Sequence, residues 1–458
     1  METPDAAPGR LRAAVPEAGR LVRLAGPLIG NNLAIAGMQF ADAVMAGRLG
    51  SRDLAAVAVG GSVWMVVFLF AMGTLMAISP LVAERYGAGK HRLIGRYVRQ
   101  GFTIALTFGV GIVALLWAAA RPALELIGID PGFRELTGDY VEAIALGGPG
   151  LCLYLVLRFT SEAIGWTRPI MYVSLMALVV NVIGNYALMW GNFGFPAMGA
   201  QGCGLASAIA MWFLLLAMAA YVLGSERYRP FAIFAKLPRP RWRLQRQVLR
   251  VGLPIAVTIV AEAGLFAAIS LLMGTLSANV AAAHQIAVNF ASTLFMIPLA
   301  LNSATTVRVG QALGRRELAT ARFRGWVGIW LCGACMGVSA LGLLLFRESV
   351  VDIYTTDPEV SAIAVTLLFV AAVFQVSDGI QVGAAGALRG YQDTRIPMFL
   401  TTLAYWIIAF PLALLAAKRY ALQPELIWGG FVVGLTVAAV LLVWRYNVIS
   451  RRETWRRA

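Results

Sequence analysis

The chain has 458 residues, of which 59% are hydrophobic and only 13% are charged. Its mean hydropathy is +0.75, whereas about a quarter of the residues in a soluble domain are charged, so the composition excludes an ordinary soluble fold. The apolar runs are long and continuous, which favours membrane-spanning helices over the short alternating strands of a barrel.

Residues 1–23 are polar and contain no evident secretory signal, and apolar runs of about 20 residues, long enough to cross a bilayer, recur after them. We expect twelve spans: 24–46, 55–82, 97–119, 137–157, 169–190, 200–223, 251–274, 280–306, 325–346, 361–387, 397–417 and 425–444. A hydrophilic segment rich in proline and arginine follows the sixth span. The predicted parts are a cytoplasmic N-terminal segment 1–23, an N-lobe 24–223, a cytoplasmic linker 224–250, a C-lobe 251–444 and a cytoplasmic tail 445–458.

The basic residues fall mainly on one side of the predicted membrane. Of 38 lysines and arginines, 31 lie in segments on the side of the N-terminus and 7 on the other side. Cytoplasmic loops collect lysine and arginine, so both termini are expected in the cytoplasm. This topology accounts for the net charge of +15 without a nucleic-acid partner.

The residues that usually carry enzyme or metal chemistry are sparse. Cys332 and Cys335 form a CxxC inside an apolar run with no second pair, which indicates core packing rather than a metal or redox site. There are two histidines and no HExxH, GxSxG or Walker motif. We therefore expect neither an enzyme, nor a cofactor, nor a structural metal.

The two halves of the chain resemble each other at an offset of 227 residues. Pro27 aligns with Pro254, Gly47 with Gly274, and the sequence TRPIM at 167–171 with TRIPM at 394–398. Six spans per copy give both copies the same orientation in the membrane. The expected fold is an all-α membrane protein of twelve helices in two pseudo-symmetric six-helix lobes, with a substrate site between them.

Three acidic residues lie within predicted spans rather than in loops: Asp42, Glu262 and Asp378. A charged acid at the bilayer centre costs about 2.5–3.5 kcal/mol, so the three together would cost about 8–10 kcal/mol. No basic residue lies within about five positions of any of them in the sequence. Unpaired intramembrane acids usually line a hydrated cavity, where they bind a cation or pass a proton.

Other polar residues are candidates to support these acids. Asn181 and Asn185 are spaced i, i+4 and share a helix face, which could turn toward Asp42 with Ser207 nearby. In the second half, Gln285, Asn289 and Gln375 are candidates for the same role. Each of them alone also suits an ordinary hydrogen bond between helices.

At these residues the sequence resembles the multidrug and toxic compound extrusion (MATE) family, and its NorM-like branch most closely. The resemblance rests on FADAVMAGRLGSRDLAA around Asp42, GLPIAVTIVAEAGLF around Glu262, FQVSDGIQVGAAGALRGYQDTRIP around Asp378, and GFPAMGAQGCGLASA. It covers residues 24 to about 445. It implies a drug antiporter with the MATE fold, in which Asp42, Glu262 and Asp378 take part in cation coupling and substrate binding.

Two positions depart from patterns found in the family. Phe374 stands where some NorM members have tyrosine, so a hydroxyl is absent, although the ring could still offer its face to a cation in the cavity. Asn185 stands where certain members carry an acid, which leaves Asp42 as the one buried charge of the first half.

The resemblance implies a secondary active multidrug efflux antiporter in the bacterial inner membrane, acting as a monomer on small organic cations and drugs. The coupling ion is H⁺ or Na⁺, with Glu262 and Asp378 as the possible Na⁺ ligands. The alternative within the same superfamily is a flippase for a lipid-linked precursor, which would suit a cationic cavity better than these acids. An ion channel is a further alternative, to which the two-lobe symmetry is poorly suited.

Overall fold

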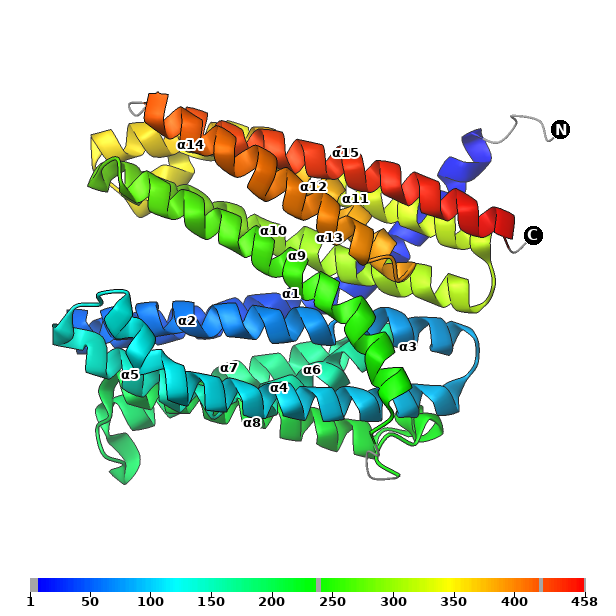
Figure 1. Ribbon diagram of the computed structural model, residues 1–458, viewed down its shortest axis with the longest axis horizontal. Coiled ribbons are helices and arrows are strands. Elements are labelled where there is room, and N and C mark those ends of the chain that lie inside the picture. Colours follow the sequence, from blue (N-terminus) through cyan, green and yellow to red (C-terminus); the bar gives the residue numbers. More distant parts are fainter. Residues whose placement is uncertain (1–6, 236–239, 420–422, 457–458) are drawn as a thin grey trace. The chain divides into compact units, whose positions relative to one another are not determined.

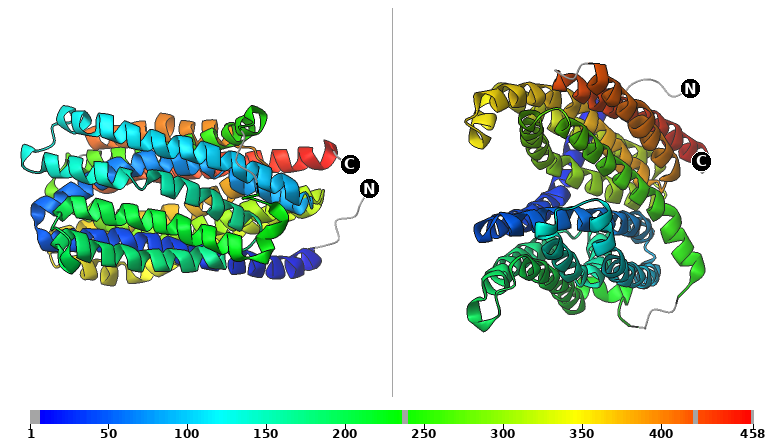
Figure 2. Two further views of the ribbon diagram at one scale, coloured as in Figure 1. Left: turned by 90° about the horizontal axis from the view of Figure 1, so that it is seen from below. Right: turned by 60° about the vertical axis from the view of Figure 1, so that its left-hand side comes forward.

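The structure, a computed structural model, describes residues 7–235, 240–419 and 423–456, and within these ranges every regular element is helical. The chain forms two compact units. One comprises residues 27–256, and the other combines the residues before Pro27 with those after Ala256. Within each unit the long helices run alongside one another (Figures 1 and 2).

The unit of residues 27–256 contains most of α1 and all helices up to the start of α9. The elements are α1 (Ala7–Leu49), α2 (Ser51–Leu75), α3 (Ile78–Gly87), α4 (His91–Leu126), α5 (Pro131–Ala145), α6 (Gly148–Ala163), α7 (Arg168–Trp190), the 3₁₀ turn η1 (Asn192–Gly194), α8 (Gly199–Gly224), the 3₁₀ turn η2 (Glu226–Phe231) and α9 (Trp242–Gly274).

The other unit holds the first turns of α1, the later part of α9 and all the helices that follow. These are α10 (Ala278–Gly314), α11 (Leu318–Tyr354), α12 (Pro358–Gly390), α13 (Arg395–Thr402), the π-helical segment η3 (Leu403–Ala409), α14 (Phe410–Arg419) and α15 (Pro424–Arg456). The start of α1 and the end of α15 lie at the same end of this unit (Figure 1).

With the exception of the span 137–157, the predicted spans agree with the observed helices. In the described ranges, ten helices are long and apolar enough to cross a membrane, and the bent pair α5–α6 supplies an eleventh. The remaining predicted span lies in α1, which carries Asn31, Asn32 and Gln39 in its apolar run. Asn31 is fully buried, so α1 turns this polar group toward protein, whereas Gln39 is exposed. The all-helical, twelve-span prediction is confirmed.

The predicted span 137–157 differs from the structure, because it is divided between α5 and α6, which meet at 44°. The break contains Gly147, and Pro149 occupies the first turn of α6, a position that proline favours. At this point α4 approaches so closely that a Cβ on Gly109 would lie 2.4 Å from the Cα of Pro149. Glycine at 109 therefore permits the bend to pack against α4.

Two helices, α1 and α9, pass from one unit into the other along their length. The change falls after Gly26 in α1 and after Ala256 in α9, close to Pro27 and Pro254, which are equivalent in the repeat. The first turns of α9 pack in the unit of residues 27–256, where a Cβ on Gly252 would lie 2.1 Å from the carbonyl oxygen of Thr74. Each sequence half thus begins with a helix whose first turns pack with the other half. The lobe boundaries expected from the sequence remain a prediction.

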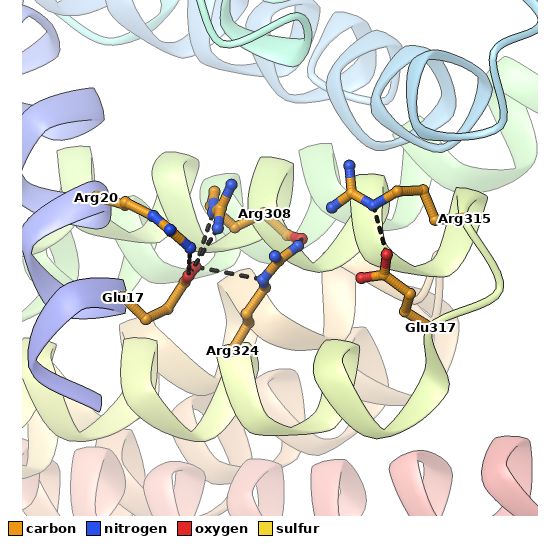
Figure 3. A network of polar contacts seen from close by, with 6 residues as sticks. All are labelled: Glu17, Arg20, Arg308, Arg315, Glu317 and Arg324. Atoms are coloured by element: carbon orange, nitrogen blue, oxygen red, sulfur yellow. Dashed lines mark hydrogen bonds and ion pairs between the residues drawn. The ribbon is translucent and has the colours of Figure 1, made fainter. Parts of the chain in front are cut away.

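The first turns of α1 are held by a cluster of ion pairs around Glu17 (Figure 3). The Glu17 side chain is 5% exposed and accepts two hydrogen bonds from Arg308 of α10, at 2.7 Å to Oε1 and 2.6 Å to Oε2. Arg324 of α11 lies 3.4 Å from Oε1, and Arg20 lies 3.4 Å from Oε2. Nearby, Arg315 and Glu317 pair at 3.0 Å across the α10–α11 turn. One carboxylate therefore ties α1 to both α10 and α11.

Burial alone would raise the pKa of the Glu17 carboxyl, but its hydrogen bonds to Arg308 and the charges of Arg308, Arg324 and Arg20 prevail and lower the pKa. The ionised form is therefore favoured in the folded state. The resulting stabilisation is present at neutral pH and is lost as the pH falls through this lowered pKa.

We predict that Glu17→Gln lowers the free energy of unfolding by about 3 kcal/mol at pH 7, because buried arginines lose their counter-charge. Thermal unfolding of the purified protein in detergent measures this change, and the difference from wild type should shrink below pH about 4, where a carboxyl protonates.

The matched control is Glu226→Gln, which removes an ion pair whose Glu226 and Arg229 side chains are 84% and 72% exposed. This control should change the unfolding free energy by no more than about 0.5 kcal/mol. Equal effects of the two substitutions would contradict the assigned role of Glu17.

Candidate functional site

The Asp42 carboxylate lies in a buried cluster formed by α1, α7 and α8. Its side chain accepts hydrogen bonds on Oδ1 from the Asn185 amide at 2.6 Å and from the Asn181 amide at 3.1 Å. Its Oδ2 accepts a hydrogen bond from the Ser207 hydroxyl at 3.0 Å. Asp42 is 8% exposed. The i, i+4 spacing of the two asparagines indeed turns both amides toward this acid.

Small residues bring α7 and α8 close enough for this cluster to form. A Cβ on Gly202 of α8 would lie 2.5 Å from the carbonyl oxygen of Leu188 on α7, and Gly184 of α7 packs against Ala206. On its other side α8 contacts α5, where a Cβ on Gly204 would lie 2.6 Å from the carbonyl oxygen of Tyr140. The glycine-rich sequence that opens α8 therefore positions Ser207 beside the asparagines.

Three donors on one carboxylate are suited to its ionised form, which has only acceptor oxygens. Burial without such donors would oppose the charge. The cluster is complete except for the Asn185 carbonyl oxygen, which is buried and has no hydrogen-bond partner. Asp42 thus receives hydrogen bonds from two amides and a hydroxyl.

The second pair of acids, Glu262 of α9 and Asp378 of α12, lies in the other unit. The two carboxyl groups are close enough to interact electrostatically, and the Tyr405 hydroxyl lies within electrostatic range of both. Asp378 is 6% exposed and Glu262 is half-buried. Arg389 of α12 lies within electrostatic range of Glu262. The structure therefore groups the two acids that the sequence separates by more than a hundred residues.

One face of α12 carries polar side chains, and another face carries glycines that pack against α11. Gln375, Asp378 and Gln381 follow one another at intervals of three residues and share one face. Gly379 and Gly383 lie against α11, where an added Cβ would approach the Cys332 carbonyl oxygen to 2.7 Å and the Ile329 Cα to 2.8 Å. The glycines let α12 pack tightly against α11.

A π-helical segment, Leu403–Ala409, supplies the aromatic groups near these acids. The Gln381 amide donates a hydrogen bond to the Tyr405 hydroxyl, and the Trp406 indole donates one to the carbonyl oxygen of Ala261, next to Glu262, at 3.1 Å. The extra residue per turn of a π-helix lets adjacent side chains reach two different neighbours, and such segments are frequent at functional sites.

Several buried polar atoms on the α12 face have no hydrogen-bond partner. They are Gln375 Nε2 and Oε1, Asp378 Oδ1 and Gln381 Oε1. Leaving a buried polar group unpaired costs about 1–3 kcal/mol, so this concentration calls for a functional reason. A carboxylate can accept a proton, and both carboxylate and amide oxygens can bind a hard cation such as Na⁺. In the described ranges no group of three His, Cys, Asp or Glu side chains could hold a metal ion.

The remaining predicted site residues are Gln285, Asn289 and Phe374. Gln285 and Asn289 are exposed on α10, where Asn289 accepts a hydrogen bond from Tyr354 at 3.2 Å, and no hydrogen bond joins either to Glu262 or Asp378. Phe374 is 3% exposed, and its ring centroid lies 5.9 Å from that of Trp428 and 6.0 Å from that of Phe431. His284, next to Gln285 on α10, is buried and forms hydrogen bonds with Trp428 and Ser270.

Sequence reasoning missed Gln381 and Tyr405. Gln381 follows Asp378 by three residues, just as Gln375 precedes it by three, so this spacing could have indicated that Gln381 shares their helix face. A lone hydroxyl in the apolar run around Tyr405 was a weaker signal, because the π-helical segment that directs it has no sequence signature of its own.

The model of the MatE family matches the chain twice, at residues 27–187 and 254–415. The two matches begin 227 residues apart, which is the offset of the internal repeat.

Relatives match over nearly their whole length. The "Multidrug resistance protein PmpM" of Pseudomonas aeruginosa is 44% identical over 450 residues, covering 97% of this chain and 93% of the relative. The "Probable multidrug resistance protein NorM" of Xanthomonas campestris pv. campestris is 40% identical over 454 residues and 99% of each chain.

Solved structures share the fold. A MATE crystal structure in the bent conformation matches with a TM-score of 0.88 at 19% identity over 99% of each chain. The eukaryotic MATE transporter AtDTX14 matches with a TM-score of 0.85 at 22% identity, over 97% of this chain and 99% of that one. The chain is therefore a member of the MatE family, in the NorM-like branch of the multidrug and toxic compound extrusion transporters.

Proposed function

We propose that the protein is a secondary active multidrug efflux antiporter that exports cationic or amphiphilic organic compounds in exchange for H⁺ or Na⁺. The observation that carries the proposal is the pair Glu262 and Asp378, grouped beside unpartnered buried amide and carboxyl oxygens. The names of the curated relatives, which describe multidrug resistance proteins, support the substrate class. The bacterial inner membrane, cytoplasmic termini and a monomeric state are parts of the same proposal.

The coupling step follows from the chemistry of the two acids. A proton or Na⁺ neutralises a carboxylate that would otherwise attract an organic cation, so binding of the ion weakens binding of the drug. Binding of the ion also shifts the equilibrium between conformations, because a ligand favours the state for which it has higher affinity. Asp42, whose carboxylate accepts hydrogen bonds from Asn181, Asn185 and Ser207, is the acid of the unit of residues 27–256 in the same proposal.

The chief alternative is a flippase for a lipid-linked precursor of the same superfamily. An anionic lipid headgroup would need buried cations near the site. The buried charges of the three candidate positions are acidic instead, which favours cationic substrates. Transport of an organic cation against its gradient also separates an antiporter from a channel.

We predict that Glu262→Gln and Asp378→Asn each reduce gradient-driven uptake of ethidium into proteoliposomes to the protein-free level. Each substitution keeps the size of the side chain and removes its ability to ionise. Uptake is measured once with an imposed proton gradient and once with an imposed Na⁺ gradient, and the gradient that drives wild-type uptake identifies the ion.

The matched control is Asp352→Asn, which neutralises an exposed acid of α11 in the same unit and should leave uptake unchanged. Wild-type rates in both site variants would refute the coupling proposal. Absence of dye uptake by the wild type under either gradient would favour the flippase alternative.

A second prediction concerns the support of Asp42 by Asn185. Removing a hydrogen bond to a charged group costs about 1.5–3 kcal/mol, so Asn185→Ala should lower the unfolding free energy by about this amount. In an Asp42→Asn background the charge is absent, so the same substitution should cost less. Thermal unfolding of the four proteins in this double-mutant cycle gives the coupling energy.

A coupling energy of zero would show that Asp42 does not depend on Asn185. The control Asn192→Ala, at an amide that bonds only the Tyr186 carbonyl oxygen on the surface, should show no coupling to Asp42.

A further inference from the structure

A pocket of about 660 Å³ lies within the unit of residues 27–256, where α3 ends and where α4 and α9 begin. None of the three proposed coupling acids lines it. Its lining combines cationic side chains with aromatic and leucine side chains: Arg85, Lys90, Leu93, Arg96, Tyr97, Arg241, Trp242, Arg243 and Leu244. Five of these nine residues are basic and none is acidic.

Most of the positive charge in this pocket has no counter-charge within the protein. Arg85 pairs with Glu84 at 2.9 Å. The other four basic residues, Lys90, Arg96, Arg241 and Arg243, make no ion pair among the described residues and are exposed. Arg96 and Arg241 also lie within electrostatic range of Arg99. Like charges in one pocket repel each other, so the arrangement favours binding of an anion.

The pocket is built by contacts between segments about 150 residues apart in sequence. The Tyr97 hydroxyl donates a hydrogen bond to Gln247 of α9 at 2.6 Å, and the backbone N–H of Arg241 donates one to the Gln100 side chain at 2.8 Å. Tyr97 is 4% exposed. These partly buried hydrogen bonds fix the start of α9 against α4 and bring the two groups of cations together.

One wall of the pocket is suited to the apolar part of a ligand. Leu93 and Leu244 are half-buried, and Trp242 is 68% exposed. An exposed tryptophan beside arginines is typical of the interface between a membrane and water, where the indole contacts glycerol and acyl groups. Arginine binds phosphate through charge-assisted hydrogen bonds, two of which can form at once from one guanidinium group.

We propose that this basic pocket binds a phosphate group, as carried by the headgroup of an anionic phospholipid or by free phosphate. Arg96 and Arg243 reach it from α4 and α9, and Lys90 and Arg241 complete the positive lining. Tyr97, Trp242 and the two leucines cover the part of the ligand next to the phosphate. Both α4 and α9 belong to segments predicted to be cytoplasmic at these ends, where the membrane surface carries anionic lipid.

The test uses the purified full-length chain and two double variants of equal charge change. Arg96→Gln/Arg243→Gln removes one cation of the pocket from each helix. Arg92→Gln/Arg246→Gln removes exposed cations from the same two helices that do not line the pocket. Each protein is titrated in neutral detergent with phosphatidylglycerol, phosphatidylcholine or inorganic phosphate, and the increase in melting temperature gives the affinity.

We expect phosphatidylglycerol to stabilise the wild type and the control variant, and to bind the pocket variant about thirtyfold more weakly, since each basic residue contributes about a factor of five to six. Phosphatidylcholine should have no effect. Inorganic phosphate that stabilises the wild type to the same extent, with the same loss in the pocket variant, identifies free phosphate as the ligand source. Equal affinities of the two double variants overturn the proposal.

A second measurement does not depend on the stability of the arginine variants. Phosphatidylglycerol with brominated acyl chains quenches tryptophans that it contacts, and the difference between wild type and Trp242→Phe isolates the signal of Trp242. With the headgroup in the pocket, this difference should saturate with phosphatidylglycerol and be removed by unlabelled phosphatidylglycerol but not by phosphatidylcholine. Equal displacement by the two unlabelled lipids would contradict a phosphate-specific pocket at Trp242.

Discussion

Burial of a carboxyl group in an apolar helix bundle is the constraint on which the rest of this structure depends. Such a group must receive hydrogen bonds, bind a cation or hold a proton, because an unpaired charge away from water is too costly to keep. The protein meets this constraint in two ways. Asp42 receives three donors from Asn181, Asn185 and Ser207, whereas Asp378 keeps a buried oxygen without a partner. Both oxygens of Asp42 therefore have hydrogen-bond donors within the fold, whereas one oxygen of Asp378 has none among the described residues.

The glycines follow from the same constraint. Donors can converge on a buried acid only if their helices approach closely, and in both units the helices that carry the polar residues meet through glycine. Gly202 lets α8 lie against α7 beside Asp42, and Gly379 and Gly383 let α12 lie against α11 behind Asp378. The polar face and the small-residue face of one helix therefore act together, since the second holds the first in place. In a membrane, where lipid is as apolar as leucine, such close packing replaces the hydrophobic effect as a source of association.

Much of the fold and of the Asp42 cluster could be predicted from the sequence, because apolar runs and isolated acids are strong signals in a membrane protein. Twelve apolar runs, the repeat offset and three isolated acids suffice for the fold, and the spacing of Asn181 and Asn185 indicated the partners of Asp42. Features set by packing rather than by local pattern could not be predicted. The π-helical segment that carries Tyr405 has no sequence signature of its own, and local pattern did not show that α10 buries His284 and exposes Gln285. Glu17 resembled an ordinary terminal acid, since only the folded chain brings Arg308 and Arg324 to it.

The first turns of α1 and of α9 each belong to a different unit from the rest of the same helix. Glu17 fixes the start of α1 to α10 and α11, while the same helix continues to Asp42 in the unit of residues 27–256. Likewise, Gln247 fixes the start of α9 to Tyr97, and that helix continues to Glu262 in the other unit. Each of the two helices therefore carries an acid of one unit and an anchor in the other. In the proposed antiporter, neutralisation of either acid would therefore act on a helix whose other end is anchored in the other unit.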